Sequence, residues 1–178
     1  LVSVSRAWLR EMVEQPQALE EILPATSVQS GMVFHAAFTP QADAYFERMG
    51  AIFEGPLDLD AFRAAWGDVA RAFSVLRTTF AWEDLPAPVQ LVWRPEDFEF
   101  PISFADFSDR PEGVQQGDLV DWLGADQQRG IDLARGPLAR LALVRLAEDR
   151  HAFLFSFHHA ILDGWSVARV LQAVLASY

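Results

Sequence analysis

Short, largely apolar runs alternate along this 178-residue chain with segments of helical spacing, and the short runs predict strands. Two pairs of such runs are joined by short turn-rich segments, at 84–88 and 147–150, and so predict two hairpins. The second hairpin has the most apolar strands, so we expect it at the centre of a sheet, where both faces are covered. The full set of predicted strands is 44–54, 77–83, 89–94, 98–104, 138–146 and 151–159.

The helical period of about 3.6 residues appears in four further segments. Thr26 and Gln29 fit a capping box, in which the hydroxyl and the amide satisfy free N–H groups at the start of a helix. Asp58 begins a second helix whose apolar residues share one face, and Gly130 ends a third. The predicted helices cover 26–35, 58–73, 113–129 and 164–178.

The first 23 residues differ from the rest of the chain. They contain one short helical pattern followed by a polar, proline-containing stretch, and we expect a linker or the tail of an upstream domain over 1–23. Strands and helices mix over 24–178, which predicts one α/β (α+β) unit, a two-layer mixed sheet with packed helices. The last helix meets no stop signal before residue 178, so we expect the natural protein to continue.

Composition narrows the class of protein. The chain is 51% hydrophobic, with 14 Phe and 6 Trp, which is enough apolar surface for one buried core. Its formal net charge is -11 and no run of Lys or Arg forms a basic stripe, so neither nucleic acid nor a membrane is an expected partner. The chain has no Cys, no signal-peptide pattern and no stretch near about 18 apolar residues. We therefore expect a cytoplasmic location.

The strand at 151–159 ends on two adjacent histidines, which are the best candidates for chemistry. Strand alternation puts His158 and His159 on opposite faces, so they do not act as one unit. An imidazole at a strand end beside a cavity accepts a proton near neutral pH, which favours His159 as a general base. Gly164, after Asp163, tolerates close approach of a ligand, and the N–H groups that begin the next helix are oriented donors.

Plainer interpretations of the same residues stay open. A His pair after an aromatic strand is often only packed or hydrogen-bonded near a turn, and Asp-Gly is a common turn dipeptide. A metal site from His158, His159 and Asp163 is not expected, because adjacent strand residues point apart. Ser156 and Ser166 lack a G-x-S-x-G context, and no phosphate-binding glycine pattern occurs. Triad hydrolases, kinases and dinucleotide enzymes therefore have no support.

The stretch HHAILDGWS at 158–166 resembles the HHxxxDG signature of nonribosomal peptide synthetase condensation domains. Ala72 and Phe73 depart from the Arg-His pair that is usual in the second motif of that family, whereas the later Arg of this motif is kept as Arg77. The resemblance covers about residues 22–178. Four further segments resemble motifs of the family, in its order: PATSVQSGMVFH at 24–35, FRAAWGDVARAFSVLRTTF at 62–80, PVQLV at 88–92 and GIDLARGPLARLAL at 130–143.

The resemblance implies roles for individual residues. It implies that His159 is the catalytic residue, which deprotonates or orients the α-amino group of an acceptor. Asp163 is expected to form a structural ion pair with Arg77, because an unpaired buried carboxylate is costly. Gly164 is expected to leave room for a phosphopantetheine-bound substrate. The supporting positions of the motif are His158, Asp163, Gly164, Trp165 and Ser166.

By the same resemblance, the chain is the N-terminal lobe, with a chloramphenicol-acetyltransferase-like fold, of an acyltransferase in antibiotic or other secondary metabolite biosynthesis. The full domain would form a peptide bond between a donor acyl or peptidyl thioester and an acceptor aminoacyl thioester. Both substrates would be carried on the 4'-phosphopantetheine of peptidyl carrier proteins, with no cofactor bound directly. A C-terminal lobe and an adenylation domain are the other implied partners, and the fragment alone is expected to be inactive. The alternatives are an epimerisation domain of the same fold and a non-catalytic carrier-protein docking module.

Overall fold

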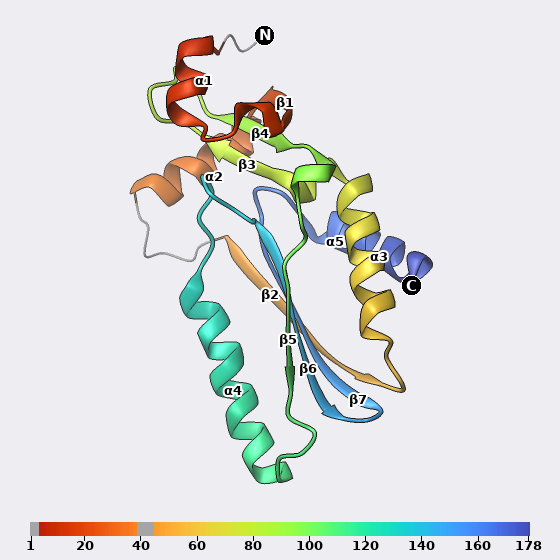
Figure 1. Ribbon diagram of the computed structural model, residues 1–178. Helices are drawn as coiled ribbons and strands as arrows, with labels where there is room; N and C mark the ends of the chain where they lie inside the picture. Colours follow the sequence, from red (N-terminus) through yellow and green to blue (C-terminus); the bar gives the residue numbers. More distant parts are fainter. Residues whose placement is uncertain (1–3, 39–44) are drawn as a thin grey trace.

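The computed structural model describes residues 4–38 and 45–178, so residue 44 of the predicted strand 44–54 lies outside the described part. The strands form two sheets, and the smaller sheet lies beyond the end of the larger one (Figure 1). The smaller sheet has the order β1-β4-β3, with bounds Leu19–Pro24, Val89–Trp93 and Thr78–Ala81. The larger sheet has the order β2-β7-β6-β5, with bounds Phe46–Glu54, Arg150–His158, Ala139–Ala147 and Ile102–Asp106.

The larger sheet is mixed, as the sequence predicts. β6 and β7 form an antiparallel hairpin in its centre, and almost every residue of both strands is buried. β2 pairs antiparallel with β7 at one edge, and β5 pairs parallel with β6 at the other. Because β7 runs toward the smaller sheet, the residues that follow His158 lie near the place where the two sheets approach each other (Figure 1).

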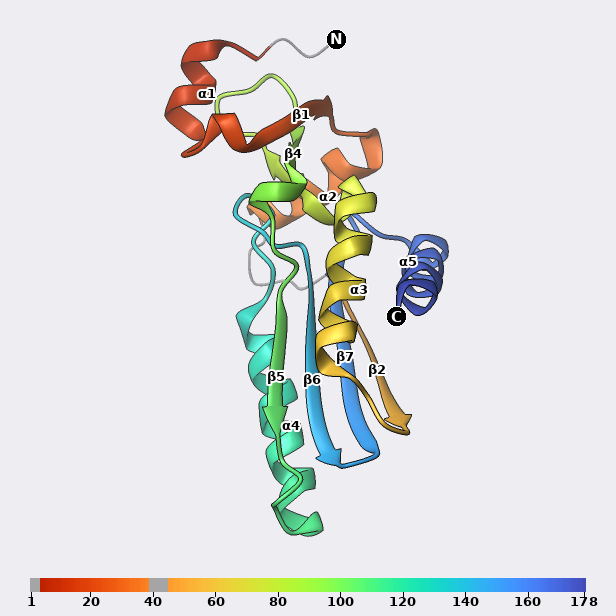
Figure 2. The same cartoon turned by 45° about the vertical axis from the view of Figure 1, so that its right-hand side comes forward.

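Helices cover both faces of the larger sheet (Figure 2). On one face, Phe62 and Trp66 of α3 pack against Phe153 and Phe155 of β7, and α5 joins the same apolar cluster. α4 lies on the opposite face, where its Trp122 packs beside a second cluster. None of the helices in the described part combines the length and apolar character that a membrane span requires. The bounds are Leu59–Ala72 for α3, Glu112–Arg129 for α4 and Gly164–Ser177 for α5.

The segment before residue 24 packs against the smaller sheet. β1 pairs with β4 along the smaller sheet, and Leu19 is buried there with Trp8 and Val13. These scattered apolar side chains pack the segment onto the smaller sheet, although their spacing in the sequence has no regular period that would predict it. The folded unit therefore includes residues that the sequence assigned to a linker. The elements before and after β1 are α1 (Arg6–Met12), the 3-10 helix η1 (Pro16–Ala18) and α2 (Ser27–Phe38).

Local signals at helix ends are confirmed. The Gln29 N–H donates to Thr26 Oγ1 at 3.2 Å, and the Thr26 N–H donates to Gln29 Oε1 at 2.9 Å, which is the predicted capping box. Gly130 follows α4 with φ of 58°, a conformation that glycine adopts without strain. Two further 3-10 helices, η2 (Ser74–Arg77) and η3 (Pro95–Asp97), flank the β3 to β4 hairpin.

Candidate active site

His159 lies directly after β7, on the face of the sheet that α3 and α5 cover. Its N–H donates to the Tyr45 carbonyl at 2.9 Å, which extends the β2 to β7 ladder by one residue. Its ring meets the Phe157 ring edge-on, with centroids 5.8 Å apart. The side chain is 34% exposed, so the imidazole is held by the sheet and still reachable from solvent.

The hydrogen bonding of His159 defines its tautomer. Nδ1 lies 2.9 Å from the Leu162 carbonyl oxygen, and a carbonyl only accepts, so Nδ1 carries the hydrogen. In the neutral ring Nε2 therefore has a free lone pair. Nε2 lies 3.5 Å from Glu47 Oε1 on the edge strand β2. A ring with Nδ1–H fixed by a backbone carbonyl and Nε2 open is arranged to accept a proton.

His158 points to the opposite face and has a different environment. It is buried, and its Nδ1 accepts a hydrogen bond from the Ala160 N–H at 3.0 Å. Burial, and then the neighbouring His159, lower the pKa of His158 to about 4. His158 is therefore neutral near pH 7, and its hydrogen bond with the Ala160 N–H stabilises the backbone of the turn.

The turn after the histidines begins α5. Asp163 is exposed, and its Oδ1 accepts from the Ser166 N–H at 2.7 Å, so it caps the helix. Hydrogen bonding from the Ser166 side chain, and then from its backbone N–H, lowers the pKa of Asp163. No atom lies within 4 Å of the place where Gly164 would carry a Cβ, so the space beside it is open. Trp165 is 85% exposed and does not line the core.

The structure does not bring Arg77 and Asp163 together, which corrects the expected ion pair. Arg77 is buried, donates to the Ala70 carbonyl at 2.9 Å, and pairs with Glu20 Oε2 at 2.8 Å. It also donates to the Trp93 carbonyl. The guanidinium donates its hydrogen bonds to the end of α3 and to the smaller sheet. Asp163, in contrast, is exposed and caps α5.

Gln29 was not predicted as a site residue, yet it connects α2 to the turn at 159–163 that follows β7, here called the histidine turn. Its Nε2 donates to the Ala160 carbonyl at 2.9 Å and to Gln90 Oε1 at 3.1 Å. The same side chain closes the capping box at Thr26. The capping pattern identified Gln29 in the sequence, but its contact across 131 positions had no local signal. Glu47 was missed for a related reason, since strand register is not readable from either strand alone.

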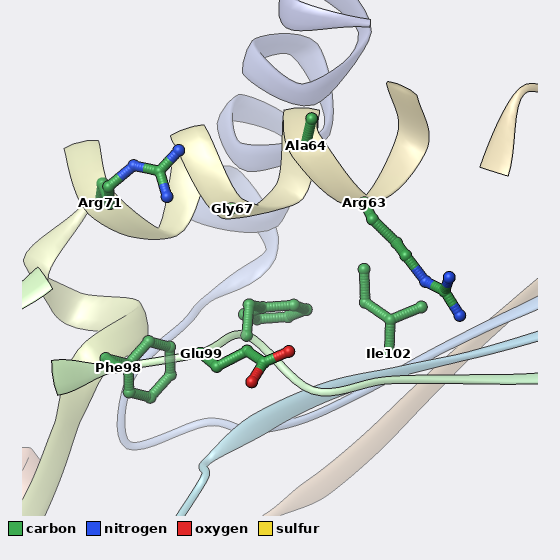
Figure 3. A pocket seen from close by; sticks show the side chains of 8 residues that line it. Arg63, Ala64, Gly67, Arg71, Phe98, Glu99 and Ile102 are labelled. Atoms are coloured by element: carbon green, nitrogen blue, oxygen red, sulfur yellow. The ribbon is translucent and has the colours of Figure 1, made fainter. Parts of the chain in front are cut away.

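Two hollows of the surface lie away from His159. The first, of about 340 Å³, runs along α3, where Arg63 and Arg71 lie on either side of Gly67 and above Glu99 (Figure 3). The second, of about 780 Å³, lies among the tryptophans of α1 and the β3 to β4 hairpin. His159 lines neither of them. Within residues 4–38 and 45–178, no three His, Asp or Glu side chains gather in a way that could hold a metal ion.

Comparisons with known proteins agree on one family. A family model described as "Condensation domain" matches residues 19–178. The chain is 33% identical over 178 residues to one component of the linear gramicidin synthase of Brevibacillus parabrevis, and the match covers all of this chain and 2% of that protein. It is 31% identical to one component of the mycosubtilin synthase of Bacillus subtilis, and this match covers all of this chain and 7% of that protein.

Solved structures show the same fold. The starter condensation domain of rhizomide synthetase superposes with a TM-score of 0.78 at 21% identity, over 89% of this chain and 39% of that one. The first condensation domain of the calcium-dependent antibiotic synthetase gives a TM-score of 0.73 at 22% identity, over 87% of this chain and 36% of that one. The chain thus spans less than half of these solved chains and a few per cent of the curated relatives.

Proposed function

The chain belongs to the condensation-domain family of nonribosomal peptide synthetases, and from that premise we propose that residues 24–178 form the N-terminal lobe of a peptide-bond-forming domain. The C-terminal lobe would come from further residues of a longer protein. β1 belongs to the same lobe, since it completes the smaller sheet. Coverage of less than half of the solved condensation domains supports a one-lobe assignment.

The proposed reaction joins two thioesters. Each substrate is carried on the 4'-phosphopantetheine of a carrier protein, one as a donor acyl or peptidyl group and one as an acceptor aminoacyl group. The acceptor α-ammonium gives one proton to Nε2 of His159, and the free amine attacks the donor carbonyl carbon. A C–N bond forms and the donor C–S bond breaks. The second proton of the nitrogen passes to the departing thiolate, and the imidazolium later returns its proton to solvent.

One observation carries the proposal: His159 has Nδ1–H bound to the Leu162 carbonyl and Nε2 open on an exposed side. A neutral imidazole with one open nitrogen is the usual general base for an amine nucleophile. The open space at Gly164 supports passage of a pantetheine arm. The Gly164 N–H at the start of α5 is available to a developing oxyanion, whereas the Ser166 N–H already donates to Asp163.

The partners of this reaction follow from its chemistry and belong to the same proposal. A donor and an acceptor carrier protein must both reach His159, and an adenylation domain must load the acceptor amino acid. The curated relatives are synthase components far longer than this chain, which supports such neighbours. We place the protein in the cytoplasm, where amino acids and ATP for loading are available.

The test is amide formation between two loaded carrier proteins by the complete domain, followed by mass spectrometry. Replacement His159→Ala is expected to lower kcat at least about 100-fold, the usual contribution of a general base. His35→Ala is the matched control, because His35 is an exposed histidine on α2. Equal rates for wild type and His159→Ala would remove His159 from the reaction.

The same experiment separates the alternatives. An epimerisation domain would invert the α-carbon of a loaded aminoacyl thioester and form no amide. A docking module would bind carrier proteins without turnover and with no dependence on His159. Chiral analysis of the recovered amino acid and the yield of amide distinguish the three outcomes.

A further inference from the structure

We propose that Glu47 on β2 receives the α-ammonium group of the acceptor and holds it against Nε2 of His159. The inference rests on the proposed function, and it adds a substrate-binding residue to the histidine turn. Its basis is the distance of 3.5 Å between Glu47 Oε1 and His159 Nε2.

The two facing atoms have the same hydrogen-bonding character. Because Nδ1 of His159 carries the hydrogen, the neutral ring presents a lone pair at Nε2. The Glu47 carboxylate is also only an acceptor. Two acceptors that face each other at this distance call for a donor that both can share. An ammonium group has three N–H donors and a positive charge, so it satisfies both atoms at once.

The sheet places Glu47 on the correct face. In the β2 to β7 register Glu47 is opposite Phe157, and the next pair on the same face is Tyr45 with His159. Arg48, the next residue, points the other way and donates to Gln127 Oε1 of α4 at 2.8 Å. This anchor on the far face fixes the strand, and the glutamate is therefore held in position on the near face.

Glu47 is also open to a ligand. Its side chain is 53% exposed, because β2 is the edge strand of the larger sheet. Among the described residues, the neutral His159 ring is the only basic side chain within 4.0 Å of the Glu47 carboxylate, and no Lys or Arg neutralises it. The carboxylate thus keeps its charge for an incoming cation, at a place that solvent and substrate can reach.

The carboxylate has a second use as the reaction starts. The acceptor first binds as an ammonium between the two side chains. One proton then moves to Nε2 of His159, which leaves a neutral amine and an imidazolium. Glu47 faces that imidazolium and stabilises its charge, so the negative charge is useful before and after the transfer. No bond to Glu47 forms or breaks.

The consequence is selection of α-amino acceptors. A thioester whose acyl group lacks the α-amino group offers no cation to Glu47 and gains nothing from it. We therefore expect the complete domain to bind the amide analogue of an aminoacyl-pantetheine about tenfold more tightly than its des-amino counterpart, as a charge-assisted hydrogen bond supplies this much.

The experiment compares both analogues by titration calorimetry on the complete domain. Glu47→Gln keeps the size of the side chain and removes its charge, and it is expected to abolish the preference for the amino ligand while leaving the des-amino ligand unchanged. Glu54→Gln is the matched control, because Glu54 is an exposed glutamate at the other end of β2. It should keep the full preference.

Kinetics give a second reading. In amide formation, Glu47→Gln should raise the KM for the acceptor carrier about tenfold and leave the KM for the donor carrier unchanged. Glu47→Asp should recover part of the loss. Equal weakening of both analogues would mean a structural effect and would overturn the inference, as would an unchanged preference in Glu47→Gln. Absence of amide product from the wild type would instead refute the proposed function. The calorimetric comparison would still test the role of Glu47, because ligand binding does not depend on turnover.

Discussion

At the scale of single residues, the two adjacent histidines differ in burial and in hydrogen bonding. His158 is buried behind the sheet and hydrogen-bonded to the Ala160 backbone, whereas His159 is partly exposed with Nε2 open. The alternation of side chains in β7 causes the difference, because one position along a strand moves a side chain to the other face. Only the second histidine is reachable from solvent through Nε2.

The low pKa of His158 predicts a loss of stability in mild acid. Its folded pKa is about 4, below the ~6.5 of an unfolded chain, so the unfolded state takes up the proton first as pH falls. Stability from this group is present above about pH 6.5 and is lost toward pH 4. Between pH 7 and pH 5 we expect the complete domain to lose about 2 kcal/mol that His158→Gln does not lose.

Urea unfolding of both proteins at the two pH values measures this difference. His151, whose pKa is also lowered by burial, titrates in both proteins and cancels. The same pH dependence in wild type and variant would contradict the buried, neutral state of His158.

Sequence reasoning succeeded for residues whose partners are near in the chain. The Thr26 and Gln29 capping box spans three positions, and its residue types alone define it. The expected ion pair of Arg77 and Asp163 was wrong, because the fold and not the sequence decides which distant residues meet. It brings Arg77 to Glu20 and the Ala70 carbonyl, while Asp163 caps α5. For Glu47 the strand alternation indicates a face, but its neighbour His159 depends on the register between β2 and β7.

At the scale of elements, a buried polar network holds α4 on the larger sheet. Asp126 of α4 accepts from Arg140 of β6 and from Ser156 of β7, both at 2.6 Å. Arg140 also donates to the Gly130 carbonyl at the end of α4. Burial raises the pKa of Asp126, but the hydrogen bonds from Arg140 and Ser156 outweigh it, and the pKa lies below its ordinary value.

Removal of one partner of this network should loosen α4. Asp126→Asn leaves the buried Arg140 without its counter-charge, and we expect it to lower the free energy of unfolding by about 3 to 5 kcal/mol in urea denaturation of the complete domain. The double replacement Asp126→Leu with Arg140→Met should cost clearly less, since no charge stays buried alone. Asp118→Asn, which removes the partly exposed ion pair between this α4 residue and Arg110 just before the helix, is the control and should cost under about 1 kcal/mol. A similar cost for Asp118→Asn and Asp126→Asn would show that burial does not matter here.

The elements themselves were mostly predictable, and β1 shows where the prediction fails. Both hairpins and the central place of β6 and β7 follow from apolar runs separated by turns. β1 has no such run, and only Leu19 of its six residues is buried. β1 is a strand because it pairs with the free edge of β4. That edge exists only once the smaller sheet has formed, so the sequence of β1 alone does not predict it.

At the scale of the whole molecule, three distant segments meet at His159. Gln29 of α2 binds the Ala160 carbonyl, Glu47 of β2 faces Nε2, and β7 brings the histidine turn. The two sheets approach each other in this region, so segments that lie far apart in the sequence come together there (Figure 1). The motifs are recognisable in the sequence as those of the family, but the contacts of Gln29 and Glu47 with the histidine turn can be seen only in the folded structure.

The exposure of the site predicts that residues 1–178 alone form no amide above background. His159 is one-third exposed and Trp165 is 85% exposed. A base on an open surface does not fix two tethered substrates, and positioning supplies much of the rate of such a reaction. Amide yield should therefore be restored only in the complete domain, with circular dichroism to show that the isolated chain is folded. Efficient condensation by the folded chain alone would mean that a second lobe is not needed to position either substrate.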